Sequence, residues 1–196
     1  MTAVTPASFS VPVDEITVAR ARAGDEAALE ALFRRFETPV YTLARRLTGS
    51  THDAEDVLQE TFLEVVRSIR RFRGDGSLAG WIRKVAASKA FMRLRRRSSR
   101  GEEELPDDLA DPAWASSGGG GAPAAAVDRV DLEAALAQLP ATTRAVIWLH
   151  DVEGYSHDEI AVMAGRTASF SKSQLARAHA RLREVLAPGV REGACT

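Results

Sequence analysis

Basic side chains gather in two stretches of this sequence, and an acidic stretch separates them. Residues 67–100 contain twelve Lys and Arg residues and one Asp, and residues 166–191 contain six and one Glu. Residues 101–131 contain eight acidic residues and one Arg. The net charge of −1 conceals this division. Two basic blocks in a nearly neutral chain indicate a protein that binds a polyanion at two places.

The first basic block adds aromatic rings to positive charge. Phe72 and Trp81 lie in the same stretch as the run Arg95-Arg96-Arg97. Guanidinium groups contact phosphates and unpaired bases stack on aromatic rings, so this combination suits single-stranded or melted nucleic acid. Aromatic residues at helical spacing are more often part of a core, and this alternative stays open for Trp81 and for Phe72.

The second basic block follows the pattern of a helix-turn-helix unit. Ser156 with Glu159 three residues later is typical of a capping box, and a turn at Gly165 leads into a longer basic helix. One face of that helix would enter the major groove, where Gln pairs with adenine and Lys or Arg with guanine or phosphate. A helical hairpin with a solvated charged face is the alternative. The residues predicted for the groove face are Ala168, Ser169, Phe170, Lys172, Ser173, Gln174 and Arg177.

The hydrophobic pattern predicts helices on both sides of a linker and no strand of any length. In the first half, residues 28–47 continue one helical pattern, in which Pro39 predicts a kink or a restart. Ser77 is the predicted N-cap of a helix over 78–97. Between these two helices a third carries one apolar stripe, formed by Leu58, Phe62, Val65, Val66 and Ile69. In the second half, helices are predicted over 127–139, 143–152, 156–164 and 170–186.

These elements predict an all-α protein of two small helical domains. The acidic linker is rich in Ser, Gly, Pro and Ala, which favours a flexible tether. The predicted division is a tail at 1–13, a domain at 14–100, the linker at 101–126, a second domain at 127–188 and a tail at 189–196.

The composition argues against several classes of protein. No apolar run approaches the roughly 18 residues of a membrane span, and the first residues lack the features of a secretory signal, so the cytoplasm is the expected location. The single cysteine, Cys195, cannot form an internal disulfide, and no Cys/His pattern for zinc is present, so no metal or cofactor is expected. His150-Asp151 and His157-Asp158 lie near no nucleophile motif or phosphate loop, which argues against an enzyme.

Two segments of the chain resemble a known family. Asp53-Ala54-Glu55-Asp56-Val57-Leu58-Gln59-Glu60-Thr61-Phe62, followed by Phe72-Arg73-Gly74-Asp75-Gly76-Ser77-Leu78-Ala79-Gly80-Trp81-Ile82, is similar to region 2 of bacterial extracytoplasmic-function (ECF) sigma factors. Gly154-Tyr155-Ser156-His157-Asp158-Glu159-Ile160-Ala161 and the following helix resemble their region 4. The resemblance covers about residues 14–187. It implies a protein that directs core RNA polymerase to specific promoters and helps to open the −10 element.

The resemblance also implies roles for individual residues. The helix with Asp53, Asp56, Gln59 and Glu60 would bind the clamp helices of the polymerase β′ subunit, and the β subunit is a further expected contact. The acidic linker would extend toward the polymerase active site and the RNA exit path, and an anti-sigma factor would hold the protein inactive. The implied −10 contacts are Phe72, Arg73, Trp81, Arg83, Lys84, Ser88, Arg93, Arg95, Arg96 and Arg97. The implied −35 contacts are Ser169, Phe170, Lys172, Ser173, Gln174 and Arg177.

The sequence departs from the family pattern at a few positions. Ser88 stands where the family usually has Asn in the base-capturing helix, and Met92 stands where it has an acid one turn later. Phe170 and Gln174 depart from the usual Gly-Thr-Val-Lys-Ser-Arg entry to the recognition helix, whereas its Lys and Ser are matched. Phe170 either anchors the helix or contacts a thymine methyl group. These departures bear on the promoter sequence rather than on the general role.

A stand-alone regulator, whose helix-turn-helix binds DNA without polymerase, is the competing prediction. It leaves the acidic helix, the acidic linker and the first basic block unexplained. Binding of the whole chain to duplex DNA on its own would favour this alternative.

Overall fold

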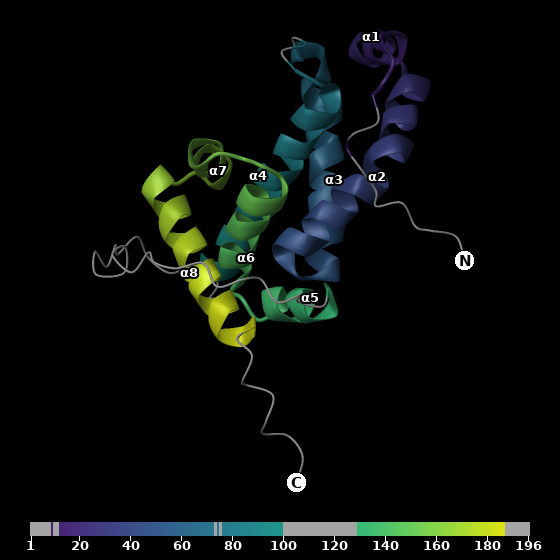
Figure 1. Ribbon diagram of the computed structural model, residues 1–196. Coiled ribbons are helices and arrows are strands. Elements are labelled where there is room, and N and C mark those ends of the chain that lie inside the picture. Colours follow the sequence, from purple (N-terminus) through teal and green to yellow (C-terminus); the bar gives the residue numbers. More distant parts are fainter. Residues whose placement is uncertain (1–8, 10–11, 73, 75, 100–128, 187–196) are drawn as a thin grey trace. The chain divides into compact units, whose positions relative to one another are not determined.

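A computed structural model of the chain describes residues 9, 12–72, 74, 76–99 and 129–186. Every regular element in these ranges is a helix, which confirms the predicted all-α class. The chain divides into two compact units, Met1–Arg96 and Arg97–Thr196, and each is described by itself (Figure 1). The predicted linker, Arg73 and Cys195 lie outside the described residues. The domain boundaries drawn from the sequence stay predictions.

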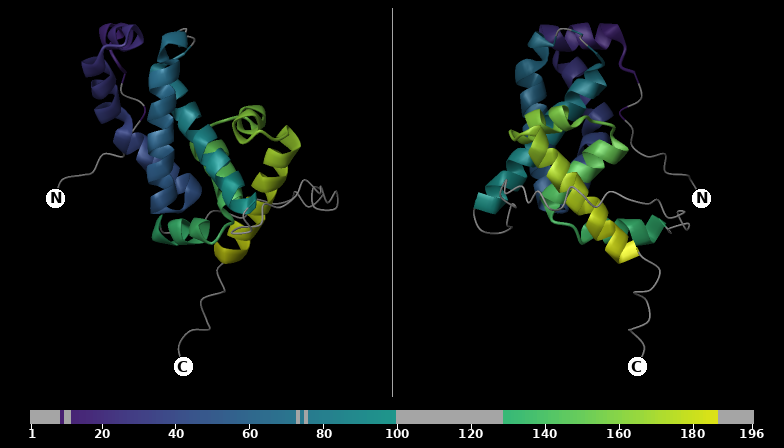
Figure 2. Two further views of the ribbon diagram at one scale, coloured as in Figure 1. Left: turned by 180° about the vertical axis from the view of Figure 1, so that it is seen from behind. Right: turned by 60° about the vertical axis from the view of Figure 1, so that its left-hand side comes forward.

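The N-terminal unit is a bundle of α-helices joined by short turns. Its elements are α1 (Glu15–Ala23), α2 (Glu26–Thr48), α3 (Thr51–Ser68), the 3-10 turn η1 (Ile69–Arg71) and α4 (Leu78–Ser99). Side chains of Asp14, Asp25 and Ser50 cap the first three helices, and left-handed Gly24 and Gly49 end the first two. Long helices α2 and α3 pack side by side, as both views in Figure 2 show.

Helix α2 continues through Pro39 as one element, so the predicted restart there is wrong. The proline is buried in the face that also carries Phe36 and Val40. A proline removes only one backbone donor, and the apolar face of α2 continues on both sides of it. Packing of that face against α3 therefore outweighs the local cost of the proline.

The apolar stripe predicted on α3 is only partly the buried one. Phe62, Val65 and the following Ile69 are buried as predicted, and Val57 joins them in place of the half-buried Leu58. Val66, assigned to the stripe from the sequence, is instead 51% exposed. The helix thus has apolar residues on two faces, of which only one packs in the core.

The C-terminal unit is built around its last helix. Its elements are α5 (Arg129–Ala137), α6 (Ala141–Ile147), the π-helical turn η3 (Trp148–Val152), α7 (His157–Ala164) and α8 (Ala168–Leu186). Helix α8 contacts α5, α6 and α7. The capping box of Ser156 with Glu159 is present as predicted, and Gly165 at φ +62° ends α7.

None of the helices in the described ranges is both long enough and apolar enough to cross a membrane.

Candidate nucleic-acid and protein interfaces

Arg93 on α4 bridges two carboxylates at the start of α3. Its Nε donates to Asp53 Oδ1 at 2.7 Å, and its Nη2 lies 2.5 Å from Asp56 Oδ2. Asp53 is only 5% exposed. The hydrogen bond with Asp53 and the attraction of the nearby carboxylates raise the pKa of Arg93 above its usual value. A buried carboxylate needs a partner, so this contact belongs to the fold.

Two further ion pairs join α3 to α4. Arg96 Nη1 lies 3.1 Å from Glu60 Oε1, and Lys89 Nζ lies 3.3 Å from Glu64 Oε2. Ser68 also donates a hydrogen bond to Glu64, and these contacts lower the pKa of that carboxyl. The acidic side of α3 is therefore matched by basic residues of its own unit.

These pairs correct part of the sequence prediction. Asp53 was predicted to bind polymerase, but its side chain is buried against Arg93. Arg93 was predicted to bind DNA, but its guanidinium is held by two carboxylates of α3. The sequence pattern could not separate these cases, because a pair 40 residues apart in the chain has no local signature.

The exposed face of α3 adds two apolar residues, not predicted as contacts from the sequence, to Gln59, which was predicted to bind polymerase. Leu63 is 54% exposed and Val66 is 51% exposed, and Gln59 is exposed four residues before Leu63. Positions 59, 63 and 66 follow helical spacing, so their side chains share one face. We call Gln59, Leu63 and Val66 the α3 outer face. Half-buried Asp56 and Glu60 lie on the same helix. The sequence did carry a signal of this face: the helix has apolar residues at more positions than a single buried stripe can contain.

The loop between η1 and α4 brings together the predicted aromatic residues. The ring centroids of Phe72 and Trp81 lie 5.6 Å apart with the planes tilted by 38°. Ser77 Oγ accepts from the Gly80 backbone N–H at 3.0 Å, which confirms the predicted N-cap. We call the adjoining pocket of about 430 Å³ the Trp81 pocket. It is lined by Arg71, Phe72, Gly76, Ser77, Gly80, Trp81 and Lys84.

The other predicted −10 residues that the structure describes follow one another along α4. Lys84 and Arg95 are exposed, while Arg83, Ser88 and Arg97 are half-buried. Lys84 lines the Trp81 pocket, and Arg95 lies in the last turns of the helix. The described −10 residues therefore extend from the pocket along α4 to its last turns.

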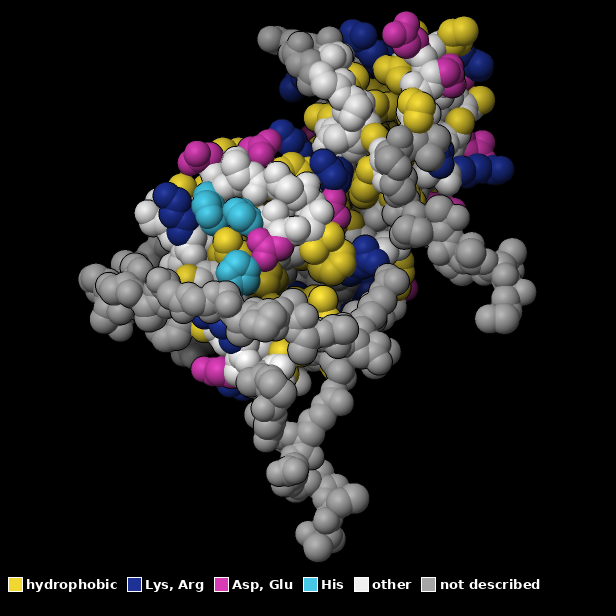
Figure 3. All heavy atoms as spheres, in the orientation of Figure 1, with side chains coloured by type: hydrophobic (Ala, Val, Ile, Leu, Met, Phe, Trp, Pro, Cys, Tyr) yellow, Lys and Arg dark blue, Asp and Glu magenta, His cyan; other side chains and the backbone are white. Residues whose placement is uncertain are grey.

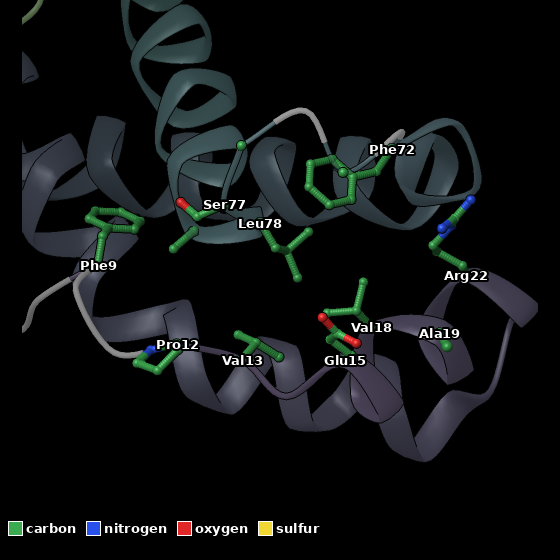
Figure 4. Close-up of a pocket in the computed structure, with 13 residues that line it drawn as sticks. Phe9, Pro12, Val13, Glu15, Val18, Ala19, Arg22, Phe72, Ser77 and Leu78 are labelled. Carbon is green, nitrogen blue, oxygen red and sulfur yellow. The ribbon is translucent and has the colours of Figure 1, made fainter.

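A second pocket, of about 610 Å³, adjoins the same loop (Figure 4). The start of α1 and the segment before it form one wall, and Phe72, Ser77 and Leu78 lie on the opposite side. We call it the α1 pocket. The sequence contained no sign of it, since the residues before Asp14 were predicted to be a loose tail.

Helix α8 exposes fewer of its predicted −35 residues than expected. Ser169 and Lys172 are exposed, and Ser173 and Arg177 are half-buried. Phe170 is 3% exposed and packs in the unit, which confirms the anchor alternative and corrects its assignment as a DNA contact.

Gln174 is the clearest correction on α8. Its side chain is 1% exposed, and its Oε1 accepts from Thr143 Oγ1 at 2.7 Å. A glutamine in this buried position cannot reach an adenine, so the predicted base contact is wrong. The satisfied hydrogen bond explains why a polar side chain is tolerated inside the unit.

Three of the four histidines of the chain lie together, His179 on α8 itself and His150 and His157 on the elements before it. The rings of His150 and His157 stack with centroids 4.5 Å apart, and His157 Nδ1 lies 3.0 Å from Ser171 Oγ. Asp151 contacts His150 at 2.8 Å and His179 at 2.7 Å. Figure 3 shows histidine side chains grouped on the face of the unit that is in view. In the described part of the chain, no group of three or more His, Cys, Asp or Glu could hold a metal ion.

The contacts within this group shift the pKa values of His157 and Asp151. Burial, then the positive charges of His150 and Lys172, lower the pKa of His157 below its usual value. Burial alone would raise the pKa of Asp151, but its hydrogen bonds with His179 and His150 outweigh burial and lower it. Of the His-Asp pairs noticed in the sequence, His150 and Asp151 bond to each other, whereas His157 contacts Ser171 and stacks on His150.

The comparisons with known proteins agree with both units. Residues 32–100 match the family model of Sigma-70 region 2, and residues 129–182 match that of Sigma-70, region 4. The ECF RNA polymerase sigma factor SigE of Mycolicibacterium smegmatis is 35% identical over 176 residues, which cover 84% of this chain and 65% of that protein. SigM of Mycobacterium tuberculosis is 32% identical over 84% of this chain and 80% of its own length. CarQ of Myxococcus xanthus is 32% identical over 85% of this chain and 94% of its own length.

Two solved structures share the fold. CnrH, in complex with the cytosolic domain of CnrY, has a TM-score of 0.51 and 23% identity, over 88% of this chain and 96% of that one. RpoE, in complex with the anti-sigma factor NepR from Bartonella quintana, has a TM-score of 0.52 and 22% identity, over 80% and 95%. The chain belongs to the ECF family of RNA polymerase sigma factors, as its two sequence motifs predicted. It spans just under two thirds of SigE and most of SigM and CarQ.

Replacing Gln174 should weaken the fold of the C-terminal unit. In Gln174→Ala the hydroxyl of Thr143 loses its buried partner, so the free energy of unfolding should fall by about 1–3 kcal/mol. Urea titration of the full chain, followed by the amide NMR signals of α8, measures this change. Exposed Lys172→Ala is the matched control and should leave stability within about 0.5 kcal/mol. An unchanged stability with an altered −35 base preference in Gln174→Ala would contradict the assignment.

The two arginines near the end of α4 should behave differently. Arg93→Ala leaves the buried carboxylate of Asp53 without its partner and should destabilise the N-terminal unit by about 3 kcal/mol or more. Exposed Arg95→Ala, two residues away, should change stability by less than about 0.5 kcal/mol. The same titration, followed by the amide signals of α3, compares them, and equal losses would show that the Arg93 contact does not hold the unit.

Proposed function

We propose that the N-terminal unit of this ECF sigma factor binds core RNA polymerase and the −10 element, and that the C-terminal unit binds the −35 element. One observation carries this proposal: both sigma regions occur in one chain, in order, on two separate helical units. A stand-alone DNA-binding protein would have no use for the first unit. Each surface is assigned from the side chains that it exposes to solvent.

The α3 outer face is the proposed contact with the clamp helices of the polymerase β′ subunit. Two half-exposed apolar side chains on one helical face are costly to leave in water, and such groups often mark a protein interface. Asp56 and Glu60 on the same helix are paired with Arg93 and Arg96, so the α3 outer face presents mainly its apolar side chains and Gln59 to a partner. Asp53 supports this contact indirectly, because its hydrogen bond with Arg93 holds the start of α3 against α4.

The Trp81 pocket is the proposed site for an unpaired base of the −10 element. Flipping a base out of the duplex costs a few kcal/mol. Stacking on an aromatic ring returns about 1–3 kcal/mol per base, and the tilted rings of Phe72 and Trp81 offer two such surfaces. Lys84 at the pocket, and Arg95 and Arg97 near the end of α4, would contact the adjoining phosphates.

The start of α8 is the proposed −35 contact. Lys172 is exposed and suited to guanine or phosphate, and Ser169, Ser173 and Arg177 lie on the same helix. Arg166 in the preceding turn, whose guanidinium lies 5.7 Å from the Phe170 ring centroid, is an added candidate for a phosphate contact. With Phe170 and Gln174 turned inward, phosphate contacts carry most of the affinity and few side chains distinguish bases.

The partners and the location of the protein follow from this role. Core polymerase and promoter DNA are both found in the bacterial cytoplasm, where we expect the protein to act. The solved structures of RpoE and CnrH each include a bound second protein, named as an anti-sigma factor for RpoE. We propose that an anti-sigma factor also binds this chain and covers the α3 outer face.

Negative charge introduced on the α3 outer face should weaken binding to polymerase. The single cysteine, Cys195, allows the full chain to be labelled with a fluorophore, and anisotropy then measures its affinity for core polymerase. Leu63→Glu combined with Val66→Glu should weaken binding by at least about tenfold, equal to about 1.4 kcal/mol. Ile16→Glu is the matched control, because Ile16 is 73% exposed on α1. Equal affinity of both variants, or equal loss in both, would overturn the assignment of this face.

A further inference from the structure

We propose that the α1 pocket binds a second unpaired base of the promoter strand, next to the base held in the Trp81 pocket. The base would carry an amino group where thymine has O4, as cytosine does with N4 and adenine with N6. This inference rests on the proposed function of the N-terminal unit, and it adds a second position at which that unit selects the promoter sequence.

The walls of the α1 pocket suit a flat apolar ligand. Its volume is about 610 Å³, within the range of small-molecule sites. Phe9, Val13, Val18, Phe72 and Leu78 supply two aromatic rings and three aliphatic side chains. Figure 4 shows Val18 directed toward Leu78 and Phe72 across the opening. A base could therefore be buried between ring and aliphatic surfaces, as in sites for single-stranded nucleic acid.

The two pockets share part of their lining. Phe72, Gly76 and Ser77 line both of them, so these three residues form a shared wall. Consecutive nucleotides of a strand that crosses this wall would place one base in each pocket. The lining that the α1 pocket shares with the proposed base site is the reason to assign a nucleotide here rather than a peptide or a small metabolite.

The shared wall also allows a strand to come close. Gly74 at φ +82° and Gly76 at φ +102° have left-handed backbone, which favours glycine. A Cβ placed on either would meet nothing within 4 Å, so open space surrounds this backbone. Both glycines therefore keep this edge of the α1 pocket free of side chains, and Gly76 does the same for the Trp81 pocket.

The polar residues of the α1 pocket define the kind of base. Figure 4 shows Glu15 beside Val18 on the α1 side of the pocket, and Arg22 on the same side, nearer to Phe72. A carboxylate repels phosphate but accepts a hydrogen bond from an amino group, such as N4 of cytosine. Thymine presents an acceptor, O4, at the equivalent place and would be rejected. Arg22 would contact the phosphate of the same nucleotide.

Filling the α1 pocket tests the proposal on the holoenzyme. A promoter is first selected with the wild-type chain and core polymerase, and each non-template position of its −10 region is then replaced by an abasic site. Open-complex formation should be sensitive at two adjacent positions. Ala19→Trp, an exposed lining position, should remove the sensitivity at one of them and reduce opening by about tenfold or more.

Two variants make the result specific. Ala23→Trp adds the same bulk to an exposed position of α1 outside the pocket lining, and it should behave as the wild type. Trp81→Phe should affect the other sensitive position. An abasic profile for Ala19→Trp equal to that of the wild type would overturn the proposal while leaving the sigma function intact. If the wild-type holoenzyme selects no promoter, both the proposed function and this inference fail.

Glu15→Gln tests the chemistry of the base. The wild type should prefer cytosine or adenine over thymine by about tenfold at the position assigned to this pocket. The amide of glutamine can also donate a hydrogen bond to O4 of thymine, so the variant should accept thymine within about threefold. Asp14 still caps α1 in this variant, so the helix should stay formed. An unchanged preference would remove Glu15 from the site, and equal use of thymine by the wild type would overturn the base assignment.

Discussion

The N-terminal unit depends on one arginine that holds two carboxylates. Asp53 is buried in the first turn of α3, and a buried carboxylate is tolerated only when a partner offsets the loss of water. Arg93 supplies that partner and contacts Asp56 as well, so it joins the start of α3 to the end of α4. The position of α4 then determines where the loop at 72–77 and both of its pockets form. The proposed base sites thus depend on a contact that touches no DNA.

Contacts of this kind mean that some charged residues of the unit stabilise the fold, while others remain available to bind a partner. Charge counts along the sequence treat every arginine of the first basic block as available to a polyanion. In the structure Arg93, Arg96 and Lys89 contact acidic residues of α3. The acidic side of α3 is correspondingly used inside the unit, and the α3 outer face offers apolar side chains to a partner instead. The C-terminal unit follows the same division, because Gln174 is satisfied by Thr143 rather than by a base.

Local signals predicted much of the fold and the class of the protein. Caps at Ser77 and Ser156 depend on neighbours within three residues, and both formed as predicted. Contacts between distant residues were beyond such signals. Val66 fits a helical stripe equally well whether it faces the core or water, and only packing against α2 decides. A polar Gln174 on a basic helix looks like a DNA contact until α6 brings Thr143 against it. The α1 pocket was missed because Phe9 lies before the first helix, and its stacking on Phe36 depends on the tertiary fold rather than on local sequence.

Transcription reconstituted from the purified chain and bacterial core polymerase, on a library of promoter sequences, is the most direct test of this account. A sigma factor with these two units should give transcripts that start at a defined subset of the library and share two conserved elements, one for each unit. No promoter-specific transcript, together with tight binding of the chain alone to duplex DNA, would contradict it and favour a regulator that acts without polymerase.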